Sequence, residues 1–382
     1  MRDLMAGASN ENLLSTPLND THIAWGGRMV GFAGYSMPVQ YKGVIAEHEH
    51  TRSAASLFDV SHMGQVIVTG PDHETTAQAL ESLMPGDLVG LNPGEMRYTL
   101  LLNDQGGIED DLIVTRPIEA GTDGVLMIVF NAGRKDHDVA ILRANLDPSI
   151  KVETFWDKAL MALQGPKAAE VLARYCDLPS KLSFMNAGAT KIEGINVYAS
   201  RSGYTGEDGF ELSVAAKDAV KLAELLVSND EVEPAGLGAR DSLRLEAGLC
   251  LYGHDMDDQR DPISAGLIFA IGKGRRVEGG FPGASTIQKI IKDGATEKRA
   301  GVRFTGRLPV REGAEIVDAN GNKIGVVTSG TFGPTIGAPV AFAYVPAEFA
   351  KLGTEITAMV RGKAVIGVVE KLPFTPANYV RL

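Results

Sequence analysis

Residues 200–211 read Ser200-Arg201-Ser202-Gly203-Tyr204-Thr205-Gly206-Glu207-Asp208-Gly209-Phe210-Glu211, the densest concentration of glycines and hydrogen-bonding side chains in the chain. The glycines in it recur at every third position. Glycine tolerates positive φ and lets a ligand or a second backbone approach closely. The stretch is therefore a loop suited to contact or tight turning, and we interpret the rest of the chain as its scaffold and its partners.

The residues that follow this loop alternate as in a β-strand. Phe210, Leu212 and Val214 fall on one face, which puts Glu211 on the other face at the mouth of the loop. A carboxylate there can accept paired N–H groups of a flat, nitrogen-rich heterocycle, and Tyr204 can pack on that ring or bond to it. A glycine-rich hairpin with a surface acid fits the spacing equally well, because glycine turns are common and only some loops carry function.

The composition is that of a globular protein with more than one domain. The 382 residues exceed what one hydrophobic core usually organises, and they suggest two or three domains. Hydrophobic residues make up 44% of the chain, and no stretch resembles a membrane span. The net charge of −11 argues against general nucleic-acid binding. We therefore expect neither a nucleic acid nor a membrane as a partner.

The cysteines and histidines do not form a metal-binding pattern. Cys176 and Cys250 are far apart, and neither has a Cys or His neighbour at ligand spacing. The side chains of His48 and His50 would leave a helix on different faces, so with His62 they are better interpreted as structural or surface histidines. We expect no metal.

The compartment and the N-terminus are predicted from the same kind of evidence. So few cysteines are typical of a reducing compartment, and we expect the cytoplasm. Residues 1–15 contain acids, asparagines and the lone Arg2 but no continuous apolar segment, so they do not resemble a secretory signal. We interpret them as a frayed start or a short non-native extension.

Two adjacent carboxylates interrupt a predicted β-hairpin. Strands are expected at residues 96–103 and 108–114, joined by a glycine-closed turn. Asp110 and Asp111 lie in the second strand and must point to opposite faces, so only one of them shares a face with the apolar residues. An acid in the middle of a strand contradicts β propensity, and such a conflict often marks a functional site. An internal hydrogen-bonding role is the alternative, and the pattern does not choose between the two acids.

A second polar element is predicted at residues 235–248. Gly236 and Gly238 precede a helix whose first turn carries Arg240. Free backbone N–H groups and a guanidinium can together hold an anion at such a position. Ion pairing with nearby acids along the helix is the alternative interpretation.

The last part of the chain is predicted to be all-β. From Arg299 onward, short alternating segments are separated by turns, at residues 301–304, 315–317, 324–328, 340–344, 355–360 and 365–371. This pattern favours a separate small barrel or sandwich. Because helices and strands are mixed in the preceding part, the fold class is α+β.

Several blocks resemble one family when they are taken in order. The blocks are residues 31–41 (Gly-Phe-Ala-Gly-Tyr-Ser-Met-Pro-Val-Gln-Tyr), 57–64 (Leu-Phe-Asp-Val-Ser-His-Met-Gly), 103–114 with the Asp-Asp pair, 200–211, 235–248, 251–257 and 327–335. Together they resemble the T-protein of the glycine cleavage system, the tetrahydrofolate-dependent aminomethyltransferase. The resemblance covers about residues 18–374. A mild departure is Tyr35, where the family often has tryptophan.

The resemblance implies a fold and a set of site residues. The fold is a three-domain cloverleaf around a central folate cavity, with a C-terminal β-barrel or jelly roll. Its parts would be residues 1–55 with 145–285 (folate-binding), 56–144 (the Asp-Asp hairpin) and 286–382 (the barrel). In that family the second acid of the pair is the key carboxylate. The implied residues are Asp111 as that carboxylate, Glu211 on the pyrimidine edge of the pterin, Tyr204 beside the ring, and Tyr98, Met63 and Arg240 lining the cavity, with Arg240 as charge partner.

The implied reaction moves the one-carbon unit of an S-aminomethyl dihydrolipoyl arm, carried by the lipoylated H-protein, to tetrahydrofolate. Ammonia and 5,10-methylenetetrahydrofolate are the products. One alternative is another folate-dependent demethylase of the same fold. Another is a folate-binding iron–sulfur or tRNA-modification factor, whose motif has a cysteine where this chain has Gly203. A basic patch of Lys273, Arg275 and Arg276 is a candidate docking surface for the acidic H-protein.

Overall fold

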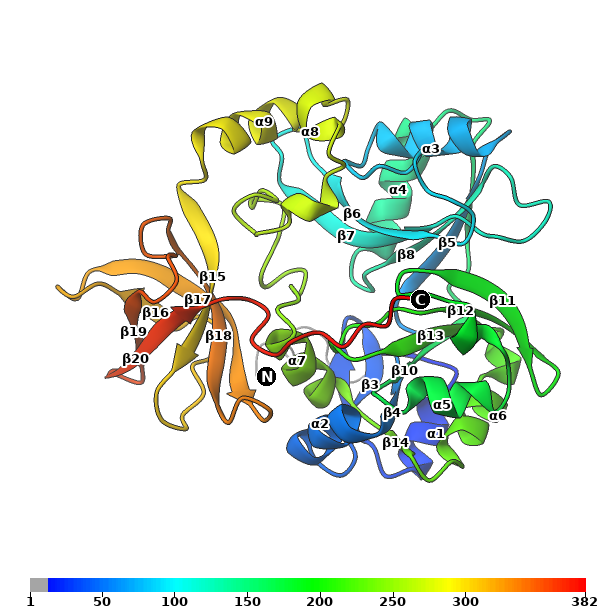
Figure 1. The fold of residues 1–382 in the computed structure, drawn as a ribbon, viewed down its shortest axis with the longest axis horizontal. Coiled ribbons are helices and arrows are strands. Elements are labelled where there is room, and N and C mark those ends of the chain that lie inside the picture. Colours follow the sequence, from blue (N-terminus) through cyan, green and yellow to red (C-terminus); the bar gives the residue numbers. More distant parts are fainter. Residues whose placement is uncertain (1–12) are drawn as a thin grey trace.

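The structure, a computed structural model, describes residues 13–382. It is an α+β protein in which a barrel formed by β15 to β20 lies apart from two sheets, and helix α7 lies between the three (Figure 1). The predicted class is confirmed. Most of the predicted N-terminal extension lies outside the described residues. Within residues 13–382, each helix is too short or too polar to cross a membrane.

A six-stranded sheet in the order β11-β12-β13-β10-β4-β14 forms the first unit. Its strands are β4 (Ala55–Asp59), β10 (Ala159–Gln164), β11 (Ala187–Ile192), β12 (Ile195–Ser200), β13 (Gly209–Val214) and β14 (Val232–Pro234). One hydrophobic core joins it to α1 (Asn19–Ala24), α5 (Ala168–Ala173), α6 (Ala216–Val227) and the 3-10 helix η1 (Leu178–Ser180). In α6, Ala219, Leu222, Ala223 and Leu226 recur at helical spacing and are all buried, which gives the helix one apolar face.

Strand β13 carries Glu211 out of this core. Glu211 lies opposite Ala162 on β10 and Ser200 on β12. Its neighbours Phe210 and Leu212 belong to the hydrophobic core, as the alternation predicts. A small sheet of β1 (Leu14–Ser15), β2 (Arg28–Phe32) and β3 (Tyr35–Gln40) completes the N-terminal part.

A five-stranded sheet in the order β6-β7-β8-β5-β9 forms the second unit. Its elements are β5 (Gly64–Thr69), α3 (His73–Glu81), β6 (Met96–Leu102), β7 (Ile108–Thr115), β8 (Val125–Phe130), α4 (Lys135–Asn145) and β9 (Lys151–Thr154). The predicted hairpin is β6 with β7. Along β7 every second residue is buried, so Asp110 shares the inner face with Leu112 and Val114, and Asp111 lies on the opposite face.

The C-terminal unit is a closed barrel in the order β15-β18-β17-β16-β19-β20. Its strands are β15 (Glu297–Phe304), β16 (Glu315–Val317), β17 (Lys323–Gly333), β18 (Ala338–Pro346), β19 (Glu355–Val360) and β20 (Lys363–Glu370). Closure leaves no unpaired sheet edge. Of the predicted all-β forms, the structure adopts the barrel.

The elements between the sheets and the barrel hold the units together. They are α2 (Val44–Ser53), α7 (Leu237–Glu246), the 3-10 helix η2 (Ile268–Ala270), α8 (Arg275–Glu278) and α9 (Ala284–Asp293). Helix α7 packs against α2, β3 and the barrel strands β17 and β18. After the barrel, residues 371–382 return as an extended segment to the first unit, where the Asn378 N–H donates to the Gly206 carbonyl at 2.8 Å (Figure 1).

Candidate active site

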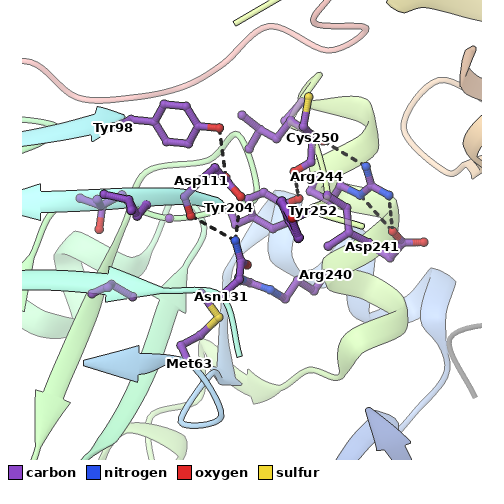
Figure 2. Close-up of a pocket in the computed structure, with 18 of the residues that line it drawn as sticks. Met63, Tyr98, Asp111, Asn131, Tyr204, Arg240, Asp241, Arg244, Cys250 and Tyr252 are labelled. Atoms are coloured by element: carbon purple, nitrogen blue, oxygen red, sulfur yellow. Dashed lines mark hydrogen bonds and ion pairs between the residues drawn. The ribbon is translucent and has the colours of Figure 1, made fainter. Parts of the chain in front are cut away.

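A central cavity of about 1070 Å³ is lined by residues from both sheets, from α7 and from the segments after it. All six residues selected from the sequence line it: Met63, Tyr98, Asp111, Tyr204, Glu211 and Arg240. Figure 2 shows most of them around one space, with Asp111 facing Tyr98 and Asn131. Residues that are up to 177 positions apart, from Met63 to Arg240, therefore meet at one site.

Asp111 is the acid of the pair that faces the cavity. The Tyr98 hydroxyl donates to its Oδ2 at 3.0 Å, and the Asn131 Nδ2 donates to its Oδ1 at 2.7 Å. Burial, followed by the negative charge of Asp110, raises the pKa of Asp111 to about 7, against the lowering effect of these two hydrogen bonds. A carboxyl group with such a pKa can both accept and release a proton near neutral pH.

Asn131 is a site residue that the sequence analysis did not select. It follows β8, and its Nδ2 reaches Asp111 Oδ1 at 2.7 Å and Asp110 Oδ1 at 2.8 Å. One amide thus joins the cavity acid to the buried acid (Figure 2). The available signal was an Asn-Ala-Gly sequence that ends a wholly apolar strand, because polar residues at strand ends are often placed for function.

Glu211 lies in a poorer hydrogen-bonding environment. The Ser202 hydroxyl donates to its Oε2 at 3.2 Å. Burial raises the pKa of Glu211, and the positive charge of Arg240 opposes that shift. A carboxylate in this position has acceptor capacity left over for N–H donors of a ligand.

Tyr204 and Arg240 form one stacked pair. The Arg240 guanidinium lies 4.6 Å above the centre of the Tyr204 ring, a cation–π arrangement. The Tyr204 hydroxyl donates to the Cys250 carbonyl oxygen, so its proton is already used. Within residues 13–382, the buried Nη1 of Arg240 has no hydrogen-bond partner. Tyr204 therefore offers packing, and Arg240 offers an N–H donor to a ligand.

The side chain of Gln164 holds the loop of residues 200–211 in place through hydrogen bonds. Gln164 Nε2 donates to the Ser202 carbonyl at 2.9 Å, and its Oε1 accepts from the Thr205 hydroxyl at 2.9 Å. A side chain on Gly203 would meet the Gln164 amide at 1.8 Å, so only glycine permits this approach. The loop is a shaped wall of the cavity and not a simple surface hairpin.

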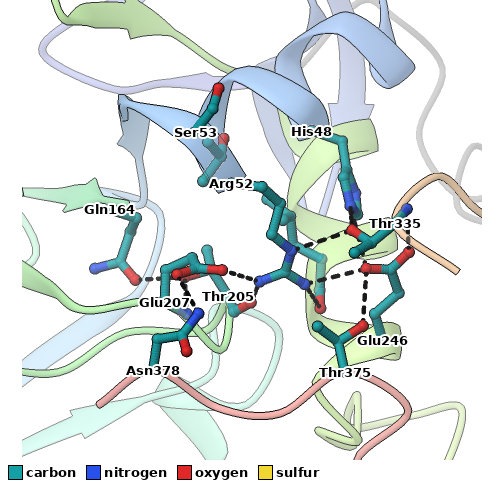
Figure 3. A network of polar contacts seen from close by, with 12 residues as sticks. His48, Arg52, Ser53, Gln164, Thr205, Glu207, Glu246, Thr335, Thr375 and Asn378 are labelled. Carbon is teal, nitrogen blue, oxygen red and sulfur yellow. Dashed lines mark hydrogen bonds and ion pairs between the residues drawn. The ribbon is translucent and has the colours of Figure 1, made fainter. Parts of the chain in front are cut away.

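A buried polar network fixes the other side of the loop (Figure 3). Arg52 on α2 donates to Glu207 at 2.9 Å, to the Thr205 carbonyl at 2.7 Å and to Glu246 at 3.2 Å. Glu246 also accepts from the backbone N–H of Thr335 in the barrel at 2.9 Å. The network therefore connects the loop to α2, α7 and the barrel. Its geometry leaves little freedom in the part of the loop that carries Tyr204.

The cavity has a positive charge balance inside an acidic protein. Six arginines line it, Arg97, Arg134, Arg240, Arg244, Arg299 and Arg381, against the three carboxylates Asp111, Glu211 and Asp241. Such a balance suits an anionic ligand.

Within the described part of the chain, no group of three or more His, Cys, Asp and Glu side chains is placed so that it could hold a metal ion. Both ring nitrogens of His48 are in hydrogen-bonding contact, with Ser242 and Thr335 at 2.8 Å each.

Of the predicted basic docking patch, Lys273 is exposed, whereas Arg275 and Arg276 are engaged in hydrogen bonds within the fold. The Arg275 guanidinium donates to the Glu81 carboxylate at 2.9 Å and also to backbone carbonyls. The Arg276 guanidinium donates to the carbonyls of Ile268 and Ile271. Arg275 thus ties the segment after η2 to α3 of the second unit, and Arg276 bonds within that segment.

Comparisons with known proteins agree on one family. A family model described as the GCVT N-terminal domain matches residues 18–275, and another, the glycine cleavage T-protein C-terminal barrel domain, matches residues 298–375. The mitochondrial aminomethyltransferases of Dictyostelium discoideum and Homo sapiens are each 44% identical over 98% of this chain, which covers 96% and 93% of their lengths.

A solved structure also matches along the whole fold. The glycine cleavage system aminomethyltransferase T from Bartonella henselae superimposes with a TM-score of 0.90 at 41% identity, over 97% of this chain and 100% of that one. The likeness therefore extends to the arrangement of all three units.

The comparisons correct one expectation and confirm another. The cytoplasmic prediction is wrong, because the curated relatives are named as mitochondrial enzymes. Cysteine usage separates reducing from oxidising compartments only, and cannot distinguish the cytosol from the interior of a mitochondrion. The resemblance drawn from the ordered sequence blocks is confirmed. The chain belongs to the glycine cleavage T-protein family, the tetrahydrofolate-using aminomethyltransferases.

Proposed function

We propose that this chain transfers the one-carbon unit of the S-aminomethyl dihydrolipoyl arm of H-protein to tetrahydrofolate. Ammonia, the reduced arm and 5,10-methylenetetrahydrofolate are the products. The observation that carries the proposal is Asp111, a half-buried carboxyl group on the cavity wall whose pKa is raised to about 7. A group of this kind suits a reaction in which amine protons must move and positive charge develops on nitrogen.

The recognition of the pterin is assigned to other residues that line the same cavity. Glu211 accepts the paired N–H groups on the pyrimidine edge, which would add to the single hydrogen bond that this half-buried carboxylate accepts from Ser202. Tyr204 packs beside the ring, and the unpaired Nη1 of Arg240 donates to a ring oxygen or nitrogen. Met63 and Tyr98 complete the lining. The excess of arginines favours the anionic glutamate end of the same ligand.

The chemical step requires two amine protons of tetrahydrofolate to be redistributed. One folate nitrogen forms a bond to the methylene carbon, and the carbon–sulfur bond breaks with its electron pair going to sulfur. The second folate nitrogen closes the ring as the amino group leaves. The two N–H protons end on the sulfur and on ammonia. Asp111 orients the attacking nitrogen, stabilises the cationic methylene and transfers a proton.

We also propose the three-part organisation, supported by the strand pairing. Strand β4 belongs to the six-stranded sheet and β9 to the five-stranded sheet. The two junctions of the first and second units are therefore better placed after Asp59 and after Thr154 than at residues 55 and 145. The third part begins in α9 or just before β15.

An assay with both substrates tests the activity. The protein is incubated with tetrahydrofolate and aminomethylated H-protein, and ammonia and methylenetetrahydrofolate are measured together. Equal formation of both supports the transferase. Folate binding without turnover would favour a folate-binding factor, and activity on a methylated amine or sulfonium instead would favour the demethylase. Neither alternative has an observation in its favour here.

A further inference from the structure

Behind the cavity wall, Asp110 is enclosed in the core of the second unit. Its side chain is fully buried on the inner face of β7. Its Oδ2 accepts from the backbone N–H of Asn131 at 3.1 Å, and its Oδ1 accepts from Asn131 Nδ2 at 2.8 Å. Both oxygens therefore accept hydrogen bonds from the residue that also holds Asp111.

A third carboxyl group, Asp138 on α4, packs against Asp110. Asp138 is fully buried, and its side chain is in hydrogen-bonding contact with that of Asp110. Within residues 13–382, neither of its oxygens accepts a hydrogen bond from an N–H or O–H group. Ionised carboxylates only accept hydrogen bonds, so two of them in contact are held together only if one carries a proton.

The charges around this pair do not replace that proton. Arg134, at the start of α4, donates to Glu109 at 2.5 Å, and His137 also contacts Glu109 at 3.0 Å. Lys135, next to them in the sequence, donates to Tyr35 and to the His62 carbonyl instead. The positive charge of Arg134 lowers the pKa of Asp138, but burial and the negative charge of Asp110 outweigh it.

We propose that Asp110 and Asp138 share one proton, and that this proton fixes Asp111 through the Asn131 amide, which makes Asp138 a positioning residue for the transfer reaction. The inference rests on the role proposed above for Asp111. The chain of contacts runs from Asp138 to Asp110, then to Asn131 and on to Asp111, and it ends at the Tyr98 hydroxyl.

The direction of the pKa shifts agrees with this geometry. Burial, then the charge of Asp110, raises the pKa of Asp138 to about 10, so its proton stays in place near neutral pH. Burial also raises the pKa of Asp110. With one proton the pair carries a single negative charge, and Asp110 remains an acceptor for Asn131. That single charge contributes to the raised pKa of Asp111.

Infrared difference spectroscopy tests the shared proton directly. At about pH 8.5, between the pKa values of Asp111 and Asp138, the wild-type protein should show the C=O stretch of a buried protonated carboxyl group. Asp138→Asn should abolish that band, and Asp111→Asn should leave it in place. Asp136→Asn, at an exposed position on the same helix, is the matched control. A band that persists in Asp138→Asn would overturn the proposal.

Kinetics separate positioning from simple packing. Asp138→Asn keeps an N–H donor for Asp110, so we expect kcat/KM within about twofold of wild type and an unchanged acid limb of its pH profile. Asp138→Leu removes the donor, and we expect kcat/KM to fall by roughly tenfold or more, because small displacements of reacting groups are costly. Its acid limb should move to lower pH, since losing the hydrogen bond from residue 138 raises the pKa of Asp110 further, and a more protonated Asp110 raises the pKa of Asp111 less.

The outcomes distinguish this proposal from the proposed function. If Asp111→Asn keeps full transfer activity, the role of Asp111 is wrong, whereas the infrared result on the Asp110–Asp138 pair stands by itself. If both Asp138 variants lose the same activity and keep the wild-type pH profile, Asp138 is only structural. Thermal unfolding of each variant shows that the protein compared is folded.

Discussion

Two half-buried carboxyl groups line the cavity, Asp111 on β7 and Glu211 on β13, and their surroundings differ. Asp111 has two strong hydrogen-bond donors and a like charge behind it, whereas Glu211 has one hydroxyl donor and a cation nearby. A like charge keeps a carboxyl group close to protonation, while a cation keeps it ionised. Burial raises the pKa of both acids, but the neighbouring charge adds to that shift at Asp111 and opposes it at Glu211, which suits Asp111 to proton transfer and Glu211 to recognition.

Replacing the Asp111 carboxylate should have the largest effect on activity. For Asp111→Asn we expect kcat to fall by about 10²- to 10⁴-fold, with tetrahydrofolate affinity within a few-fold of wild type, because general acid–base groups contribute on this scale. Steady-state kinetics and calorimetric folate binding measure the two quantities. Asp104→Asn, exposed in the turn of the same hairpin, is the control. Near-full activity in a folded Asp111→Asn protein would remove Asp111 from the mechanism.

The matching change at Glu211 should weaken folate binding more than it slows the chemical step. For Glu211→Gln we expect folate affinity to weaken by about ten- to hundredfold, because hydrogen bonds to a charged group are worth about 1.5–3 kcal/mol. The value of kcat at saturating folate should change much less. Glu224→Gln, exposed on α6, serves as the control. A loss confined to kcat would mean that recognition by Glu211 and proton transfer by Asp111 have been assigned the wrong way round.

The free energy of unfolding should fall when Asp111 becomes charged. The unfolded group titrates near pH 4 and the folded group near pH 7, so the folded state binds more protons between these values. Its contribution to stability is present below pH 4 and is lost as the pH rises through about 7. Asp111→Asn should therefore be more stable than wild type above pH 7, on the order of 1–3 kcal/mol, with no difference near pH 4. Denaturant unfolding at several pH values measures this, and a pH-independent difference would contradict it.

The smallest effect should come from a hydrogen bond that supports Asp111. The Tyr98 hydroxyl lowers the pKa of Asp111, so Tyr98→Phe should raise it and move the acid limb of kcat/KM upward by roughly 0.5 to 1 pH unit. The ring of phenylalanine preserves the stacking on Phe269, at 5.6 Å between centres. Activity should recover at higher pH. Tyr175→Phe, outside the cavity, is the control, and a loss that no pH restores would show that Tyr98 acts in another way.

The elements of this fold follow largely from local patterns in the sequence. Alternation places Glu211 opposite Phe210 and Leu212, and the same rule separates Asp110 from Asp111. Alternation does not predict which face of β7 is covered by a helix and which faces the cavity, because that depends on how α4 packs against the sheet. The choice of Asp111 came from the family resemblance, and the contacts now give it a physical reason.

Other features depend on contacts between distant residues, and local patterns do not record them. Residues 28–32 follow the turn signal Gly26-Gly27 and yet form β2, because pairing with β3 supplies partners that no local signal reveals. The Asn131 amide connects the end of β8 to the neighbouring strand β7, and the Tyr204 hydroxyl bonds to the Cys250 carbonyl in the segment after α7. The arginines at 275 and 276 looked free for a partner only because their carbonyl acceptors lie elsewhere in the fold.

The extended segment after the barrel has a consequence for the order in which the protein is made. Its Asn378 binds Gly206 in the loop that carries Tyr204, and its Thr375 binds Glu246 at the end of α7. On the ribosome, both sheets and the barrel emerge before this segment does. The cavity wall thus receives these two hydrogen bonds only after both sheets and the barrel have been synthesised, so a nascent chain would hold an incomplete binding site until residues 375–378 follow.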